Sequence, residues 1–418
     1  MGRGCRTDAF LECLSSLEHA NSSRPKRIDE RHESTLEWLW DEPAFEGWRT
    51  GDSSALLCLV GKPASGKSVL TQFAKGKLRD AEKETVASFF FHADGPQELR
   101  TSTAMLRGLL YDMLSRNRSF FPHFQRRFRE LKERGKERSV TWQDDDLIAV
   151  FEGLLRHPFP EKIYALVDGL DESENPSLCA EVLAKLLARV PQGGRLCIKL
   201  LVATQPGDEA ERALAVRGGI VSHRIVLQEW NADDIRAYSR SFLNAIEGNA
   251  TDMAEYGRPR DETAIRKQKR EWVESMLDII VERSENIFLW AKLVTTELVR
   301  NFQEASPADV EMFLGELNSD IQILYERLYD RLKKRASRTD DNSHMRQAER
   351  LFQIVVEAKR PLMLDEFRDV YILPKITHLH KDPGSVNMSE FRPLDMAKVI
   401  ANNTANFLEV GKETRTGT

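Results

Sequence analysis

The chain contains the stretch LLCLVGKPASGKSVL at residues 56–70. Its apolar start, residues 56–60, has the length and composition of a buried β-strand, and the residues after the loop have the character of a helix. The loop between them has the pattern G-x-x-x-x-G-K-S, in which glycines let the backbone wrap closely around phosphate groups and the following helix directs its positive end at them. The stretch therefore predicts a phosphate-binding loop, and with it a nucleotide site.

Two side chains of the loop carry the chemistry. Lys67 supplies a positive charge to the β- and γ-phosphates of a nucleotide, and the Ser68 hydroxyl is a ligand for Mg²⁺. We expect the nucleotide to contact the whole loop and the start of the helix, with the Lys62 side chain facing solvent. The candidate nucleotide-binding residues of this stretch are Gly61, Lys62, Pro63, Ala64, Ser65, Gly66, Lys67, Ser68 and Val69.

The second motif is IYALVDGLDE at residues 163–172, an apolar run that ends in acidic residues. We expect a neighbouring strand of the same sheet to bring Asp168 to its carboxyl end, beside the phosphate loop, where the carboxylate holds Mg²⁺ through water. Asp171 and Glu172 then lie in the turn before a helix. One of them, with Glu172 favoured, is a candidate to polarise an attacking water, although acidic residues at this place also serve as helix caps.

A third apolar run ends in polar residues in the segment KLLVATQP, residues 199–206. A side chain at that strand end lies where the γ-phosphate of a nucleotide would be sensed. Thr204 is therefore a candidate to hydrogen-bond the phosphate or its attacking water. The alternative is a threonine with a purely structural role, and the residues alone leave both interpretations open.

Short apolar runs alternate with amphipathic segments along the first part of the chain. Apolar residues in Met105–Leu114 and Val182–Val190 recur at three- and four-residue spacing, which is typical of helices with one face packed on a sheet. The alternation predicts an α/β fold in which a mostly parallel, five-stranded sheet is flanked by helices. The expected strands are residues 56–60, 87–92, 163–167, 198–203 and 224–227.

Strand signals stop after residue 230, and the rest of the sequence has helical character. We expect a short helical leader and lead-in at residues 1–50 and a nucleotide-binding core at 51–230. A helical lid at 231–305 and a further helical region at 306–418 follow.

Composition excludes several classes of protein. The 418 residues are 41% hydrophobic, which is too apolar for a disordered chain, and 61 Lys and Arg against 66 Asp and Glu leave a formal charge of -5. That balance argues against a protein that binds nucleic acid by bulk charge, and we expect the basic runs 126–138 and 331–338 to be solvated helix faces. The cysteines are scattered and no apolar stretch has the length of a membrane span, so we expect a cytoplasmic protein, with the nucleus left open.

The three motifs together resemble the NACHT division of the signal-transduction NTPases, in particular fungal proteins with a nephrocystin-like NACHT module. The resemblance rests on GKPASGKS, on the small residue after the acidic residue in VDGLDE, and on LLVATQP. Weaker segments agree with it. They are Arg27 and Ile28 with residues 35–38, which in the family line the adenine side of the pocket, then 89–91, the lid start 231–235, the segment SENIFLWAKLV at 284–294, and residues 351–366, which resemble the opening of a winged helix.

The resemblance implies a nucleotide switch with ATP or ADP and Mg²⁺ as cofactors. In such proteins the ADP form is packed shut, exchange for ATP opens it, and the opened molecule associates with copies of itself or with related signalling proteins, often toward cell death or non-self recognition in fungi. Hydrolysis of ATP resets the switch and is expected to be slow. No contact with nucleic acid is implied.

The sequence departs from the family pattern at three places. Gln205 stands where the family commonly has an arginine after the sensor residue, and a neutral amide does not stabilise phosphate charge as a guanidinium does. The segment before Arg27 is too short for the effector domain that usually begins such chains. The chain also stops soon after residues 406–410, before the winged helix usually supplies a histidine, so we expect a truncated winged helix and assign no phosphate contact to His378 or His380.

Two other functions remain open. One is a scaffold that keeps nucleotide for stability and does not hydrolyse it. The other is an ATPase of the related origin-recognition type that acts on nucleic acid, which the acidic charge balance disfavours.

Overall fold

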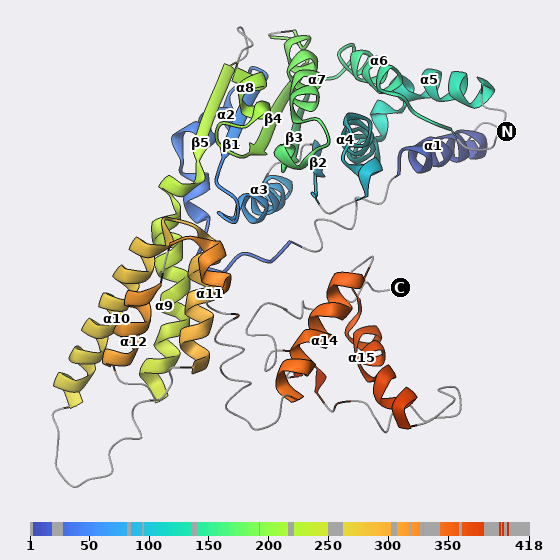
Figure 1. Ribbon diagram of the computed structural model, residues 1–418. Coiled ribbons are helices and arrows are strands. Elements are labelled where there is room, and N and C mark those ends of the chain that lie inside the picture. Colours follow the sequence, from blue (N-terminus) through green and yellow to red (C-terminus); the bar gives the residue numbers. More distant parts are fainter. Residues whose placement is uncertain are drawn as a thin grey trace. The chain divides into compact units, whose positions relative to one another are not determined.

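The computed structural model describes most of the chain in two compact units (Figure 1). Unit 1 comprises Met1–Tyr238 and Asn286–Leu289, and unit 2 comprises Ser239–Glu285 and Trp290–Thr418. The described residues are 3–18, 28–81, 85–93, 96–134, 140–191, 193–215, 221–249, 262–301, 307–317, 319–326, 329, 343–358, 362–379, 393, 395–396 and 399–400. The predicted boundaries after residues 50, 230 and 305 stay predictions.

Unit 1 is built on a five-stranded sheet in the order β2-β3-β4-β1-β5. All neighbouring strands pair in parallel, which confirms the expected α/β fold. The strands are β1 (Ala55–Val60), β2 (Thr85–Phe90), β3 (Glu161–Asp168), β4 (Leu196–Thr204) and β5 (Val221–Val226).

One detail of the predicted topology is wrong. We expected the acidic strand next to the strand that precedes the phosphate loop, but β4 lies between β3 and β1. Each connection between parallel strands is a crossover, so the order of strands in the sheet does not follow their order along the chain.

Helices cover both faces of the sheet (Figure 1). Local capping explains where several begin: Thr101 accepts a hydrogen bond from Ala104 N at the start of α4, and Asn175 accepts one from Leu178 N at the start of α7, which has proline as its first residue. The helices are α1 (Arg3–Leu17), α2 (Pro43–Thr50), α3 (Lys67–Ala81), α4 (Ser102–Arg116), α5 (Phe121–Arg134), α6 (Asp144–Leu154), α7 (Pro176–Ala188), α8 (Glu209–Ala215) and α9 (Asn231–Asn249), the last of which continues into unit 2; the short 3₁₀ helices are η3 (Glu37–Trp40), η4 (Gln97–Leu99), η5 (Arg118–Phe120), η6 (Leu170–Glu172) and η7 (Leu227–Glu229).

Successive side chains of β1 belong to two different hydrophobic clusters, one on each face of the sheet. Leu56 and Cys58 belong to a cluster that includes residues of α4, α6 and α7, whereas Leu57 and Leu59 belong to one that includes residues of α2 and α3. Successive side chains of a strand point to opposite faces, so a strand apolar at every position is buried on both sides. This arrangement fixes β1, and the loop that follows it, in the middle of the unit.

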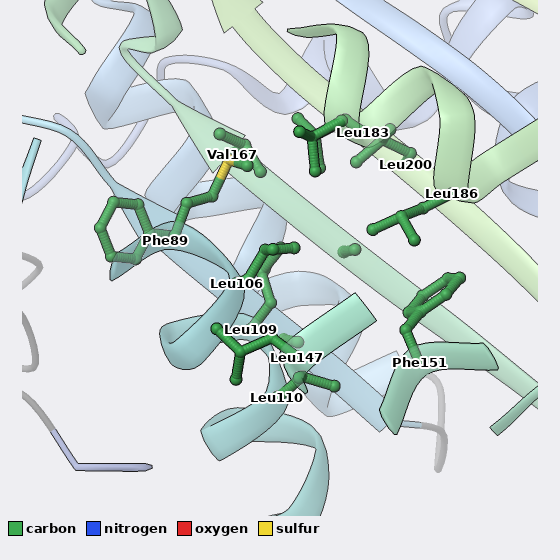
Figure 2. Close-up of a cluster of buried hydrophobic side chains, with 14 of the residues drawn as sticks. Phe89, Leu106, Leu109, Leu110, Leu147, Phe151, Val167, Leu183, Leu186 and Leu200 are labelled. Carbon is green, nitrogen blue, oxygen red and sulfur yellow. The ribbon is translucent and has the colours of Figure 1, made fainter. Parts of the chain in front are cut away.

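The larger cluster is shown in Figure 2. Leucines of α4, Phe151 of α6 and Leu183 and Leu186 of α7 converge there on Val167 of β3 and Leu200 of β4. An apolar cavity lies among these side chains. Its lining is Leu106, Leu109, Leu110, Met113, Phe151, Ala165, Leu183, Leu186, Leu187, Ile198 and Leu200.

Every described element after β5 is helical, as the sequence predicts. Within unit 2, the side chain of Ser239 hydrogen-bonds Thr295, and Arg240 pairs with Glu274. The helices are α10 (Glu262–Ser284), α11 (Phe288–Asn301), which begins in unit 1, α12 (Pro307–Glu316), α14 (Ser343–Glu357) and α15 (Leu364–Leu379).

The winged-helix-like region stays a prediction. Helices α14 and α15 pack through Leu351, Phe367 and Ile372. His378 lies in α15, while His380 and residues 406–410 fall outside the described residues. Among the described helices, none has both the length and the apolar content that crossing a membrane requires.

Candidate nucleotide site

The loop after β1 has the backbone geometry that close wrapping around phosphate needs. Gly61 N donates to Thr204 O at 3.2 Å, which ties the start of the loop to the end of β4. A Cβ on Gly61 would lie 2.6 Å from Ser65 Oγ and 3.1 Å from Lys67 Cγ, so a larger residue there requires these loop side chains to shift. Gly66 has φ +102° and Ala64 has φ +62°, the left-handed conformations that turn the chain into α3.

Lys67 lies among acidic groups at the start of α3. Its Nζ donates to Gly61 O at 2.7 Å, so the side chain folds back over the loop. Burial lowers the pKa of Lys67, and the charges of Asp171, Asp168 and Glu172 oppose that shift, with Asp171 the strongest of them. The loop cation and all the predicted acidic residues therefore belong to one site.

Asp168 lies at the end of β3 and is 1% exposed. Thr71 Oγ1 donates to Asp168 Oδ1 at 3.1 Å, and the Ser68 side chain also hydrogen-bonds the carboxylate. Burial raises the pKa of Asp168 to about 6, against the lowering effect of these hydrogen bonds. Among the described residues, Asp168 Oδ2 has no hydrogen-bond partner.

This donor set fits Mg²⁺. A buried carboxylate oxygen without a protein partner lies on a group that already contacts the Ser68 side chain. Mg²⁺ prefers oxygen ligands and in nucleotide sites keeps one or two protein ligands beside phosphate and water. Ser68 and Asp168 would hold the ion.

The acidic turn after β3 directs its two carboxylates to different partners. Gly169 takes φ +66° and begins the turn. Glu172 Oε2 accepts a hydrogen bond from Ala93 N at 2.8 Å, beyond the end of β2. Asp171 Oδ2 accepts one from Gln205 Nε2 at 2.8 Å, beyond the end of β4.

Thr204 is fully buried at the end of β4. Its carbonyl accepts from Gly61 N, and its hydroxyl donates to Asp208 Oδ2 at 3.4 Å. The residue thus lies beside the phosphate loop, and a structural role for its hydroxyl is visible. Contact with phosphate stays a prediction.

Hydrogen bonds from residues after β5 hold two backbone carbonyls of the phosphate loop. Asn231, 1% exposed at the start of α9, donates through Nδ2 to Ser65 O and to Asn286 O, both at 2.8 Å. Leu289 N donates to Ala64 O at 3.2 Å. Two loop carbonyls are thereby held by residues far along the chain, which fixes the orientation of the loop peptides.

Comparison with known proteins agrees with this geometry. Residues 34–205 match the family model of the nephrocystin 3 N-terminal region. Over 384 residues the chain is 24% identical to vegetative incompatibility protein HET-E-1 of Podospora anserina. The chain is therefore similar to the fungal NACHT-like proteins. The match covers 90% of the NACHT-like chain but only 26% of HET-E-1.

Two solved structures also align with the NACHT-like chain. A Drosophila ORC structure bound to DNA has a TM-score of 0.37 at 16% identity and covers 85% of this chain and 92% of its own. The Aeropyrum pernix ORC1 protein in complex with DNA has a TM-score of 0.32 at 12% identity and covers 93% and 86%. At TM-scores this low, neither structure bears on the function of this chain.

The lead-in of the NACHT-like core is anchored to α9. Asp234 accepts hydrogen bonds from Leu36 N at 3.0 Å and from Trp38 Nε1 at 3.0 Å, and the Trp38 ring stacks on Trp230 with centroids 4.8 Å apart. Ile28 is half-buried, and Arg27 falls outside the described residues. Their contact with an adenine base stays a prediction.

Three functional contacts were not predicted from the sequence. Thr71 lies one helical turn after Lys67 and Ser68, and that spacing alone would have placed it on the same face of α3. Asn231 and Asp234 stand in the segment that we expected to begin the lid. Nothing local indicates that these two side chains bond the loop and the lead-in.

Proposed function

We propose that the chain binds ATP and ADP with Mg²⁺ and acts as a slow, nucleotide-dependent switch in signalling of the fungal NACHT type. The observation that carries the proposal is the buried Asp168 carboxylate, joined to α3 by the Thr71 and Ser68 side chains and left with one unpartnered oxygen among the described residues. Burial of a carboxylate with an unpartnered oxygen costs free energy, and an apolar residue at this position would stabilise the fold better. The carboxylate is therefore better explained by binding of a ligand.

The chain's own groups divide the work. The loop peptides and the start of α3 bind the phosphates, and Lys67 leaves its carbonyl contacts to pair with the β- and γ-phosphates. Mg²⁺, when bound, neutralises charge between those phosphates. Asp171 and Glu172 are the candidates to orient the attacking water, and Thr204 lies near enough to the loop to report on the γ-phosphate.

The switch rests on a difference in contacts. A γ-phosphate and its metal ion interact with groups that a diphosphate does not reach, and a ligand shifts an equilibrium only by such differential binding. The similarity to a vegetative incompatibility protein supports non-self recognition or cell-death signalling as the outcome. We place the protein in the cytoplasm, with copies of itself or longer relatives as partners.

Size-exclusion chromatography with light scattering tests the switch. We expect the wild-type chain to be a monomer with Mg-ADP and a larger assembly with Mg²⁺ and a non-hydrolysable ATP analogue. Lys67→Ala should stay monomeric in both, whereas Lys62→Ala, an exposed position in the same loop, should behave as the wild type.

The result that contradicts the switch is one mass in both nucleotides. Equal thermal stabilisation by ATP and ADP without turnover would then identify the non-hydrolysing scaffold. DNA binding that survives physiological salt would instead identify the origin-recognition type of ATPase.

A further inference from the structure

The two carboxylates of the acidic turn are held in different ways. Glu172 Oε2 accepts from Ala93 N at 2.8 Å and lies 3.9 Å from His92 Nδ1, and Arg100 Nε donates to the Glu172 carbonyl. These contacts join the turn to the segment after β2, at the edge of the sheet. The Glu172 carboxylate is thus anchored through a backbone N–H, which helps to hold the turn against the segment after β2.

Asp171 is held by a side-chain amide instead of a backbone N–H. Gln205 Nε2 binds one of its oxygens, Oδ2, at 2.8 Å. The other oxygen, Oδ1, is buried and has no hydrogen-bond partner within the described part of the chain. Of the acidic groups around Lys67, Asp171 exerts the strongest effect on the lysine. Asp171 therefore combines an unpartnered oxygen, Oδ1, with the largest effect of the three carboxylates on the pKa of Lys67.

Gln205 is placed by the sheet to act on this carboxylate. It follows Thr204, the last residue of β4, and β4 pairs with β3, whose end leads into the acidic turn. The amide thus spans the ends of two adjacent strands. It donates a hydrogen bond to the carboxylate without adding a positive charge of its own, and so holds the Asp171 side chain in one orientation.

We propose that Gln205 is a positioning residue that holds Asp171, rather than Glu172, as the group that accepts the proton of the attacking water. The inference rests on the proposed function. Gln205 then has a role that differs from that of the arginine expected at this place. An arginine would form an ion pair with the carboxylate or with phosphate, whereas the Gln205 amide fixes the rotamer of Asp171.

The reaction is hydrolysis of the terminal phosphate of ATP. The oxygen of one water molecule forms a bond to the γ-phosphorus of ATP while the bond between that phosphorus and the bridging β-phosphate oxygen breaks. The electron pair of the broken bond leaves with ADP. A proton of the water passes to Asp171 Oδ1, and inorganic phosphate is released.

The test is single-turnover hydrolysis of Mg-ATP by the full chain, with ADP binding measured by calorimetry on the same samples. Gln205→Met keeps the length of the side chain and removes the donor. We expect hydrolysis about tenfold slower with ADP affinity unchanged within about twofold. Asp171→Asn should slow hydrolysis about 100-fold, and Glu172→Gln should slow it much less.

Two readouts separate positioning from general structural damage. A hydrogen-bond donor favours the ionised form of a carboxylate, so its loss in Gln205→Met should move the acid limb of the pH–rate profile to higher pH. In the Asp171→Asn background, Gln205→Met should slow hydrolysis no further. Gln97→Met is the matched control, because the Gln97 amide also donates to a carboxylate, that of Glu174, and the length of that hydrogen bond is likewise 2.8 Å.

Different results would contradict the proposed function and the role of Gln205. If the wild-type chain binds neither ATP nor ADP, the proposed function is wrong and the inference falls with it. If the wild type hydrolyses ATP and Gln205→Met keeps the wild-type rate and pH profile, the inference alone is overturned. Should Gln205→Met lose ADP binding, Gln205→Asn, which retains a donor on a shorter side chain, gives the decisive pH profile.

Discussion

The contact of Asn231 with the phosphate loop makes a sharp quantitative prediction. Asn231→Leu keeps the branched shape and the number of heavy atoms of the side chain but removes two hydrogen bonds of 2.8 Å at a position that is 1% exposed. Each neutral hydrogen bond contributes about 1 kcal/mol net, and the carbonyls of Ser65 and Asn286 lose a partner in a buried place. The free energy of unfolding of unit 1 should therefore fall by about 2–4 kcal/mol.

Thermal denaturation without nucleotide measures this change. A loss of that size lowers Tm by about 4–16 °C for a unit of this length. Because the Ser65 peptide belongs to the phosphate loop, ADP affinity measured by calorimetry should also fall, by about tenfold. The control is Asp233→Ala, an exposed position two residues further along α9, which should change neither quantity.

The reasoning is refuted if Asn231→Leu denatures within about 1 °C of the Asp233→Ala control. A large fall in Tm with normal ADP affinity would contradict only the predicted effect on nucleotide binding. That outcome would mean that Asn231 stabilises the fold without fixing the loop peptides.

Three further perturbations follow from the described contacts. Gly61→Ala puts a Cβ 2.6 Å from the nearest side-chain oxygen and should weaken ADP binding at least about tenfold by calorimetry, whereas Gly76→Ala in α3, with no atom within 4 Å, should bind normally. Asp168→Asn should raise the stability of the nucleotide-free protein. The pKa of Asp168 is about 6 in the folded state and about 3.9 in the unfolded state, so ionisation of the carboxyl destabilises the native state as pH rises between these values. In thermal denaturation, the stability advantage of the variant over the wild type should therefore grow by about 1 kcal/mol from about pH 5 to about pH 7. Equal advantages at both pH values would contradict that linkage. Leu183→Ala, in the cluster of Figure 2, should lower the free energy of unfolding by about 2–4 kcal/mol in a denaturant titration, whereas Leu178→Ala, 44% exposed on the same helix, should cost less than about 0.5 kcal/mol.

The sheet was predictable because its strands are short apolar runs buried on both faces. All the expected strands are present, but their limits differ from the expected ones by a few residues. The β5 strand begins at Val221, earlier than expected, because the polar residues Ser222 and His223 separate the exposed Val221 from the apolar run that the sequence shows. Edge strands follow hydrogen bonding to a neighbour, and the sequence pattern does not report that.

The site was predictable only in its local parts. The loop residues and Asp168 come from contiguous motifs. The bond between Thr71 and Asp168 joins residues 97 positions apart, and its existence depends on the place of β3 in the sheet. In the same way, the sequence presents Gln205 as a departure from a family pattern, and only the pairing of β3 with β4 brings its amide to Asp171.

The central claim is that the loop after β1 binds a nucleotide with Mg²⁺, and isothermal titration of Mg-ADP into the wild-type chain and Lys67→Ala tests it most directly. The account predicts binding of one ADP per chain by the wild type, an affinity at least about 100-fold weaker in Lys67→Ala, and wild-type affinity in Lys62→Ala. Absence of binding to the wild type, or equal affinities in the wild type and Lys67→Ala, would contradict it.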